Sequence, residues 1–104
     1  MSHEYTLIVY TSPVQGREEE FNAWYDEVHL AEFSALPGVL SGRRFQVIPA
    51  KGAGAGPSYA ALYELSGEPR ATLSAMNAAV KDGTMHMSDA LDPASVTMTT
   101  LKAR

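Results

Sequence analysis

One short segment constrains the fold of this chain more than any other. Residues Tyr5–Thr11 (YTLIVYT) are rich in β-branched and aromatic side chains, which favour a β-strand. Side chains in a strand alternate between its two faces, so Leu7 and Val9 share one face. Ile8 and Tyr10 share the other face. Both faces of this strand are therefore apolar, and both need cover from other parts of the protein.

Two helices are predicted from apolar periodicity and from the residues that end it. The first spans Arg17–Leu36, with three glutamates in its first turn that complement the helix dipole, and it ends at Pro37-Gly38. The second begins at Gly67-Glu68-Pro69 and ends at Asp82-Gly83. The apolar stripe of the first helix consists of Phe21, Trp24, Tyr25, Val28 and Leu36.

The remaining apolar segments predict three further strands, over Val39–Ile48, Tyr59–Leu65 and Ala94–Leu101. The element order is then β-α-β-β-α-β, the ferredoxin-like arrangement, within one α+β domain that spans residues 1–104. This order gives a four-stranded antiparallel sheet with two helices on one face. The other face stays bare and apolar, so we expect a homodimer whose sheets pack face to face and form a dimeric α+β barrel.

Two connections carry unusual residues. Pro49–Ser58 (PAKGAGAGPS) contains a Gly-x-Gly-x-Gly pattern, which in other contexts binds phosphate. Here the pattern joins two strands and opens no helix, so a plain hairpin loop is the expectation. Thr84–Pro93 (TMHMSDALDP) is predicted to be an irregular connection.

Composition excludes several classes of function. The net charge of −4 argues against nucleic acid or an anionic membrane surface as a partner. The longest apolar run, Leu7–Tyr10, is far too short to span a bilayer. The chain has no cysteine, which rules out disulfides and thiolate chemistry. Met1–Glu4 is acidic and no secretion-signal pattern follows, so a cytoplasmic protein is expected.

The first predicted helix carries an unusual cluster of polar residues. Asn22, Tyr25, His29 and Glu32 lie on or beside its apolar stripe. Tyr25 and His29 are four residues apart, within side-chain reach on a helix. Histidine is the side chain best suited to move protons near pH 7. The alternative is that His29 and Glu32 form only a partly solvated pair near the helix end.

Arg43 and Arg44 lie on opposite faces of their predicted strand. We expect one of them to point toward the helices and to share a face with Phe45, and the other to point toward the barrel or the dimer partner. A buried guanidinium needs a carboxylate or a ligand oxygen. A salt bridge with Glu64 on the neighbouring strand and the binding of an anionic ligand both satisfy this need.

The other histidines give no metal motif. His3, His29 and His86 lack the short His spacings typical of zinc sites, so no metal is expected. His3 is expected to be inert, while His86 either closes over a site or is simply exposed. No cofactor is expected, although haem bound through His29 or His86 stays open, because one axial histidine has no spacing to test.

The run from Pro13 to Phe45 (PVQGREEEFNAWYDEVHLAEFSALPGVLSGRRF) resembles the dimeric α+β barrel superfamily. It is most similar to small proteins related to the ethyl tert-butyl ether degradation (EthD-like) group. Met87–Asp92 (MSDALD) resembles the segment before the last strand in these proteins. Ala31 stands where similar proteins carry proline, so the helix is expected to end more regularly here. The resemblance rests mainly on Phe21-Asn22, Trp24-Tyr25, His29, Glu32, Pro37-Gly38 and Arg44-Phe45.

The resemblance implies a homodimer with a ligand cleft between each sheet and its helices, often lined by the helix histidine. Similar proteins include cofactor-independent monooxygenases, polyketide cyclases, lyases, isomerases from aromatic catabolism and haem enzymes. The fold therefore does not decide the function.

Our first hypothesis is a cofactor-independent isomerase or lyase that acts on a small conjugated carbonyl or carboxylate compound, such as one from the breakdown of aromatic compounds. A cofactor-independent monooxygenase is the nearest alternative. A non-catalytic protein that binds a small ligand or haem is another. In the enzyme hypothesis His29 moves the proton, and Tyr25 and Asn22 bind the substrate oxygens. The expected substrate-binding residues are Arg43, Arg44, Trp24, Phe45, Glu32 and His86.

Overall fold

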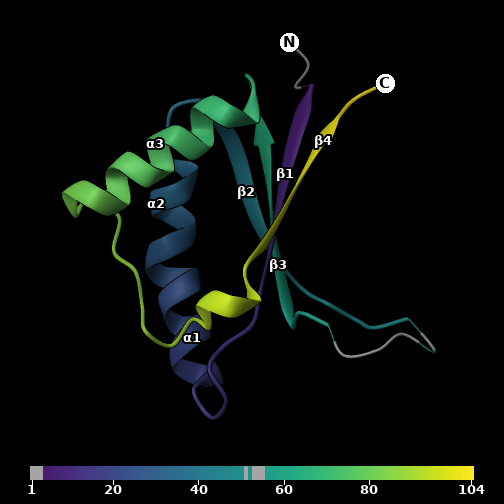
Figure 1. The fold of residues 1–104 in the computed structure, drawn as a ribbon, viewed down its shortest axis with the longest axis vertical. Coiled ribbons are helices and arrows are strands. Elements are labelled where there is room, and N and C mark those ends of the chain that lie inside the picture. Colours follow the sequence, from purple (N-terminus) through teal and green to yellow (C-terminus); the bar gives the residue numbers. More distant parts are fainter. Residues whose placement is uncertain (1–3, 51, 53–55) are drawn as a thin grey trace.

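The computed structural model describes residues 4–50, 52 and 56–104. His3 and residues 51 and 53–55 of the glycine-rich loop, with its possible phosphate-binding pattern, lie outside the described residues. The four strands form one antiparallel sheet in the order β2-β3-β1-β4, and the helices cover one face of it (Figure 1). This arrangement confirms the predicted ferredoxin-like α+β fold. The strands are β1 (Tyr5–Thr11), β2 (Val39–Gln46), β3 (Tyr59–Leu65) and β4 (Thr97–Lys102).

The first helix is not a regular α-helix over its whole length, because its middle segment is a π-helix. It consists of α1 (Glu18–Trp24), a π-helical segment η1 (Tyr25–His29) and α2 (Leu30–Ser34), which follow one another without a break. The sequence predicted a single α-helix here and did not predict the π-helical segment. The helix runs through Ala31 without interruption. This was expected, because this chain has alanine at the position where similar proteins have proline.

The boundaries of the other elements differ little from the prediction. The second helix, α3 (Pro69–Asp82), begins at its proline and ends at Gly83, whose φ of 82° is left-handed. Strand β2 ends at Gln46, although Val47 still donates a backbone hydrogen bond to Ser58. A short 3₁₀ turn, η2 (Pro93–Ser95), delays the start of β4 to Thr97, because the preceding residue Asp92 caps that turn.

The core lies between the helices and the inner face of the sheet. The side chains that fill it alternate along the strands, as Leu7 and Val9 do on β1. Phe33 of α2 stacks on Tyr63 of β3, with ring centroids 4.1 Å apart. Phe33 is almost fully buried, although the predicted stripe left it out, because the π-helical segment rotates the residues that follow it toward the sheet.

The outer face of the sheet is uncovered in the single chain. Ile8, Tyr10 and Leu62 are half-buried there, and Phe45 and Leu101 are 41% and 48% exposed. The register of β2 with β3 places Arg43 on this outer face, together with Phe45. Arg44 pairs with Ala61 and lies on the helix side. The expectation that the helix-facing arginine shares the face of Phe45 is therefore wrong.

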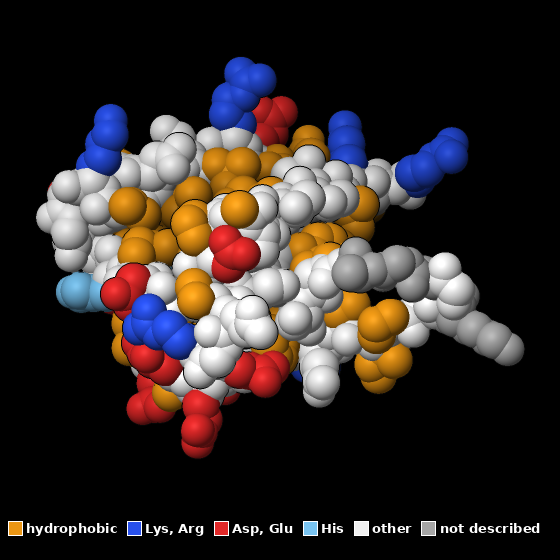
Figure 2. Space-filling view, turned by 60° about the horizontal axis from the view of Figure 1, so that its bottom comes forward, with side chains coloured by type: hydrophobic (Ala, Val, Ile, Leu, Met, Phe, Trp, Pro, Cys, Tyr) orange, Lys and Arg blue, Asp and Glu red, His pale blue; other side chains and the backbone are white. Residues whose placement is uncertain are grey.

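Charge is unevenly distributed over the surface. The end of the molecule where α1 begins carries exposed glutamates, and Figure 2 shows more acidic than basic side chains gathered on this side. Within the described part of the chain, no helix has both the length and the apolar character needed to cross a bilayer. The same residues contain no group of three or more acidic or histidine side chains that could hold a metal ion.

Gly42 lets α2 approach the sheet closely. A Cβ atom at this position would lie 2.5 Å from Ser34 Oγ and 2.8 Å from two ring atoms of the buried Tyr63. We expect Gly42→Ala to lower the free energy of unfolding by about 1–3 kcal/mol, because the ring has no space to move. Gly67→Ala is the matched control, since nothing lies within 4 Å of its added Cβ. Denaturant unfolding that gave the same loss for both variants would contradict this account.

Candidate functional site

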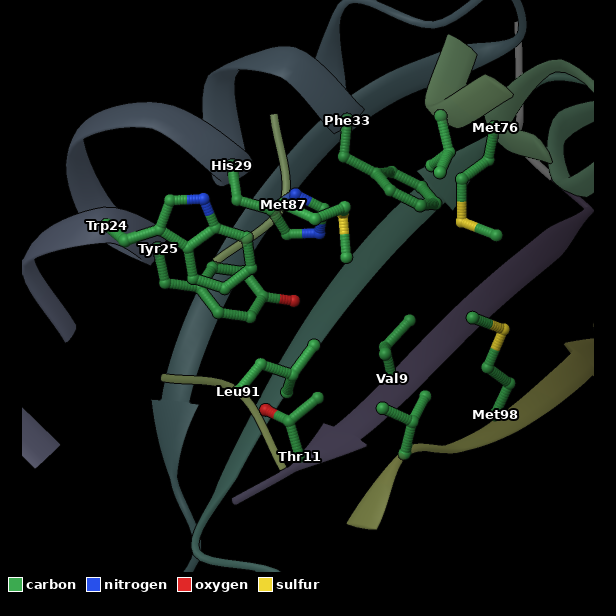
Figure 3. A pocket seen from close by; sticks show the side chains of 12 residues that line it. Val9, Thr11, Trp24, Tyr25, His29, Phe33, Met76, Met87, Leu91 and Met98 are labelled. Atoms are coloured by element: carbon green, nitrogen blue, oxygen red, sulfur yellow. The ribbon is translucent and has the colours of Figure 1, made fainter. Parts of the chain in front are cut away.

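A cavity of about 170 Å³ lies between the first helix, α3 and the inner face of the sheet (Figure 3). Its walls come from both helices, from β1 and β4, and from the connection that joins α3 to β4. The lining is almost entirely apolar, and its polar groups belong to Thr11, Tyr25 and His29. The full set is Val9, Thr11, Trp24, Tyr25, His29, Phe33, Met76, Val80, Met87, Leu91, Val96 and Met98.

The π-helical segment determines how the aromatic side chains meet. On an α-helix, residues five apart point in directions that differ by about 140°. A π-helical turn contains more residues, so positions i and i+5 come onto the same side. Trp24 and His29 are five apart, and their rings stack with centroids 4.6 Å apart and an interplanar angle of 21°. The segment therefore places the histidine against the indole and into the cavity wall.

His29 is buried among aromatic side chains. Its ring also meets Tyr25 edge to face, with centroids 4.8 Å apart, and it is only 8% exposed. Burial lowers the pKa of His29 to about 4, and the positive charge of Arg44 adds to this effect, while the Glu32 carboxylate opposes it. The ring is therefore neutral at pH 7. Its Nδ1 atom is buried without a hydrogen-bond partner among the described residues, which leaves Nε2 as the nitrogen that a ligand can reach.

Tyr25 presents a neutral phenol beside this histidine. Figure 3 shows its hydroxyl group and the His29 ring turned toward the same space. Burial raises the pKa of Tyr25, whereas Tyr63 and the nearby Arg44 charge lower it by smaller amounts. The hydroxyl therefore keeps its proton at neutral pH and can donate a hydrogen bond to a ligand oxygen.

Arg44 belongs to a second cluster behind the cavity. Its guanidinium lies 4.4 Å from the centre of the Tyr25 ring and 5.0 Å from that of Tyr59. Two of its nitrogens donate to Asp26 and Asn22, each at 2.9 Å. Arg44 therefore does not line the cavity, and its charge already has a carboxylate partner.

Asn22 lies in the cluster around Arg44 and not at the cavity. Its amide donates to the Tyr59 hydroxyl at 3.0 Å and accepts from Arg44. The carboxylate that Arg44 contacts is Asp26 and not Glu64, since the strand register places Glu64 on the opposite face of the sheet. Of the two alternatives considered for a buried arginine, a carboxylate partner or an anionic ligand, Arg44 therefore has the carboxylate partner, with Asp26 in the place of Glu64.

Glu32 holds the connection between α3 and β4 against the first helix through hydrogen bonds. One of its oxygens accepts the backbone N–H of His86 at 2.8 Å, and the other lies 2.5 Å from His86 Nδ1. Burial raises the pKa of Glu32, but the contacts with His86 outweigh this and leave it lowered. The Trp24 indole N–H donates to the His86 carbonyl at 2.8 Å. Glu32 thus contacts His86 and not His29, and Met87, the next residue, forms part of the cavity wall.

Arg43 and Phe45 lie away from the cavity, on the outer face of the sheet. The Arg43 guanidinium lies 5.1 Å from the centre of the Phe45 ring. The structure thus brings Trp24, Tyr25 and His29 together at the cavity and distributes the other expected site residues over the second cluster, the connection and the outer face.

Three cavity features escaped the sequence analysis, namely Thr11, Phe33 and the three methionines. Thr11 could have been found, because it lies two residues beyond Val9 and so shares its face of β1. The methionines come from α3, the connection and β4, and no local pattern joins them.

No protein-family model matches the chain, and no curated protein matches it by sequence. Solved structures do match it over nearly its whole length. The chain has the fold of an EthD-family protein. That protein, from Bacillus halodurans C-125, superposes with a TM-score of 0.59 at 13% identity, over 92% of this chain and 96% of its own.

Two other solved structures superpose with higher TM-scores. One is a candidate monooxygenase from Shewanella loihica PV-4, with a TM-score of 0.65, 16% identity, and coverage of 100% of this chain and 97% of its own. The other is the heme-degrader MhuD from Mycobacterium tuberculosis, with two hemes bound in its active site. It has a TM-score of 0.64 at 15% identity and covers 95% of this chain and 94% of its own. At these identities the likeness concerns the fold.

The low pKa of His29 makes stability depend on pH. Burial lowers that pKa from 6.5 to about 4, so the unfolded chain takes up a proton in this range before the folded chain does. We expect the free energy of unfolding to fall by roughly 3 kcal/mol between about pH 7 and pH 4. His29→Gln should remove this slope, whereas the control His3→Gln, at the histidine that the sequence predicts to be inert, should keep it. Equal slopes in the wild type and His29→Gln would contradict the assignment.

Proposed function

We propose that the protein is an acid/base enzyme of the isomerase type, which moves a proton within a small conjugated carbonyl compound. The observation that carries the proposal is the neutral, buried His29, which faces an apolar cavity beside the protonated hydroxyl of Tyr25. Perturbed titratable groups that converge on an apolar cavity are typical of catalytic sites.

The reaction needs two transfers of the same proton. His29 Nε2 removes a proton from the carbon next to the substrate carbonyl, and the electron pair shifts into an enolate. Tyr25 donates a hydrogen bond to the enolate oxygen and so stabilises the negative charge as it forms. His29 then returns the proton to a different carbon of the conjugated system, so the double bond moves and no atom is gained or lost.

The low pKa makes His29 a weak base when the cavity is empty. Transfer of the proton creates an imidazolium beside an enolate, and opposite charges attract strongly where water is excluded. The Glu32 carboxylate also favours the imidazolium. We therefore expect the basicity of His29 to be higher when a substrate is bound than when the cavity is empty.

Oxygenation is the second candidate, because one neighbour of the same fold is named as a candidate monooxygenase. It would begin with the same deprotonation by His29. Dioxygen would then convert a substrate CH₂ group to a carbonyl, with one oxygen atom retained and the other released as water. This reaction needs dioxygen as co-reactant, and the isomerisation does not.

Haem, which the neighbour MhuD binds, does not fit this cavity. An apolar cavity of about 150 Å³ holds one benzene ring, whereas a haem has four pyrrole rings and two propionates. The cavity here measures about 170 Å³, and none of its described lining residues is Lys or Arg. We therefore derive no step through haem.

A homodimer is also part of the proposal. The uncovered outer face of the sheet presents apolar side chains on all four strands, among them Ile8, Phe45 and Leu101. Apolar patches of this kind usually mark a protein interface. A second copy, with the same face, is the partner that we expect.

The isomerase proposal can be tested with 3-cyclohexenone, which becomes the conjugated 2-cyclohexenone when a proton moves between its carbons. We expect the wild type to produce the absorbance of the conjugated enone, and His29→Gln to be slower by about 100-fold or more. Tyr25→Phe should be slower by about 10-fold, while Tyr5→Phe, which removes a hydroxyl outside the cavity, should not change the rate.

The pH profile and the oxygen balance separate the candidates. The acid side of kcat/KM should fall near pH 4, since the pKa of His29 is lowered to about 4. Oxygen consumption in step with product would favour oxygenation over isomerisation. A rate that His29→Gln leaves unchanged would exclude His29 as the base. A Soret band in the purified protein would contradict the conclusion that haem does not fit the cavity.

The dimer is tested by sedimentation. We expect a mass of twice the 11.2 kDa of one chain at micromolar concentration. Phe45→Glu should shift the protein toward the monomer, because it places a charge on the apolar face, on its edge strand β2. Ala78→Glu, at an exposed position of α3, is the control that should stay dimeric. A wild-type mass near that of one chain would contradict the proposal.

A further inference from the structure

The size of the cavity limits what it can hold. Its volume of about 170 Å³ is close to the roughly 150 Å³ in which an apolar protein cavity holds a single benzene ring. Met76, Met87 and Met98 belong to the wall, and their flexible thioethers adapt to flat rings and contact ring edges favourably. Both features suit one six-membered ring with few substituents.

The charges of the site exclude an ionised ligand. None of the described lining residues is Lys, Arg, Asp or Glu. Arg44 is engaged by Asp26 and Asn22, and Arg43 lies on the opposite face of the sheet. A carboxylate in this cavity would lose its hydration without gaining a cation, which is strongly unfavourable.

The polar atoms of the wall call for a ligand oxygen. Thr11 Oγ1 is buried and has no hydrogen-bond partner among the described residues. Buried hydroxyl groups are nearly always paired, so an unpaired one in a cavity wall points to a polar group of a ligand. The Tyr25 hydroxyl and His29 belong to the same cavity wall, so a ligand oxygen in this cavity meets groups that can donate and accept hydrogen bonds.

We propose that the cavity takes uncharged compounds with a single six-membered ring and one hydroxyl or carbonyl oxygen, and that it rejects the corresponding ring carboxylates. This inference rests on the proposed function, in that it treats the His29 cavity as the substrate site. Of the carbonyl and carboxylate compounds expected from the sequence, it keeps the carbonyl compounds and excludes the carboxylates, and it adds uncharged hydroxyl compounds.

The chain contains a natural probe for this inference. Trp24 is the only tryptophan, and it lines the cavity, so its fluorescence reports on occupancy. The purified full chain is titrated at neutral pH with phenol, toluene and benzoate, with excitation beyond the absorption of the ligands. These three ligands share one ring and differ in whether the substituent is a hydroxyl, a methyl group or a charged carboxylate.

We expect saturable binding of phenol, weaker binding of toluene, and a Kd for benzoate at least about 10-fold above that for phenol. Thr11→Val keeps the shape of the side chain and removes its hydroxyl, so it should reduce the preference for phenol over toluene by about fivefold. Val80→Phe extends a ring into the cavity from a position that is 40% exposed, and phenol binding should be lost. Val80→Ala is the matched control and should still bind phenol.

Each result decides the inference. Benzoate binding as tight as that of phenol, or the absence of saturable phenol binding, would overturn it. Unchanged phenol preference in Thr11→Val would remove the role of that hydroxyl, even if Val80→Phe failed to fold. If phenol binds as expected but 3-cyclohexenone is not isomerised, the proposed function fails and the ligand class stands. If 3-cyclohexenone is isomerised and benzoate competes as well as phenol, the ligand class fails alone.

Discussion

The packing of the π-helical segment against the inner face of the sheet is the constraint on which the rest of the structure depends. The segment brings Trp24 and His29 into a stack and directs Tyr25 and Phe33 toward β3. Without the additional residue in this turn, positions 24 and 29 would point in different directions, and the histidine would leave the aromatic surround. The same turn therefore builds the core and the candidate site together.

The helix also separates charge from the cavity. On one side of Tyr25 lies Arg44, enclosed by aromatic rings and paired with Asp26. On the other side lies neutral His29 in an apolar wall. The positive charge of Arg44 helps to keep His29 unprotonated and offsets a small part of the rise that burial causes in the pKa of Tyr25, without touching a ligand. The charge of Arg44 thus influences the two proposed catalytic groups across the Tyr25 ring, without contacting a substrate in the cavity.

Local patterns in the sequence were sufficient for the fold but only partly for the site. Strand alternation and the Pro and Gly residues at element ends predict every strand and both helices, because each signal is contained in a few neighbouring residues. The π-helical segment has no such signal, and its rotation of the following residues is why Phe33 was missed. The pairing of Glu32 with His86 was also missed, since it joins residues 54 apart and depends on the path of a connection without regular structure.

The candidate site leaves polar groups unpaired in a chain that has little core to spare. His29 Nδ1 and Thr11 Oγ1 are both buried without partners among the described residues, and each such atom lowers stability by about 1–3 kcal/mol. A leucine or valine in their place would fill the same wall and remove this cost. The cavity that they face also forgoes contacts that a packed core would make. A small domain tolerates these losses more easily when a ligand fills the space and forms hydrogen bonds with Thr11 Oγ1 and with Nε2 of the same histidine. The unpaired hydroxyl group of Thr11 is thus better explained by binding than by folding.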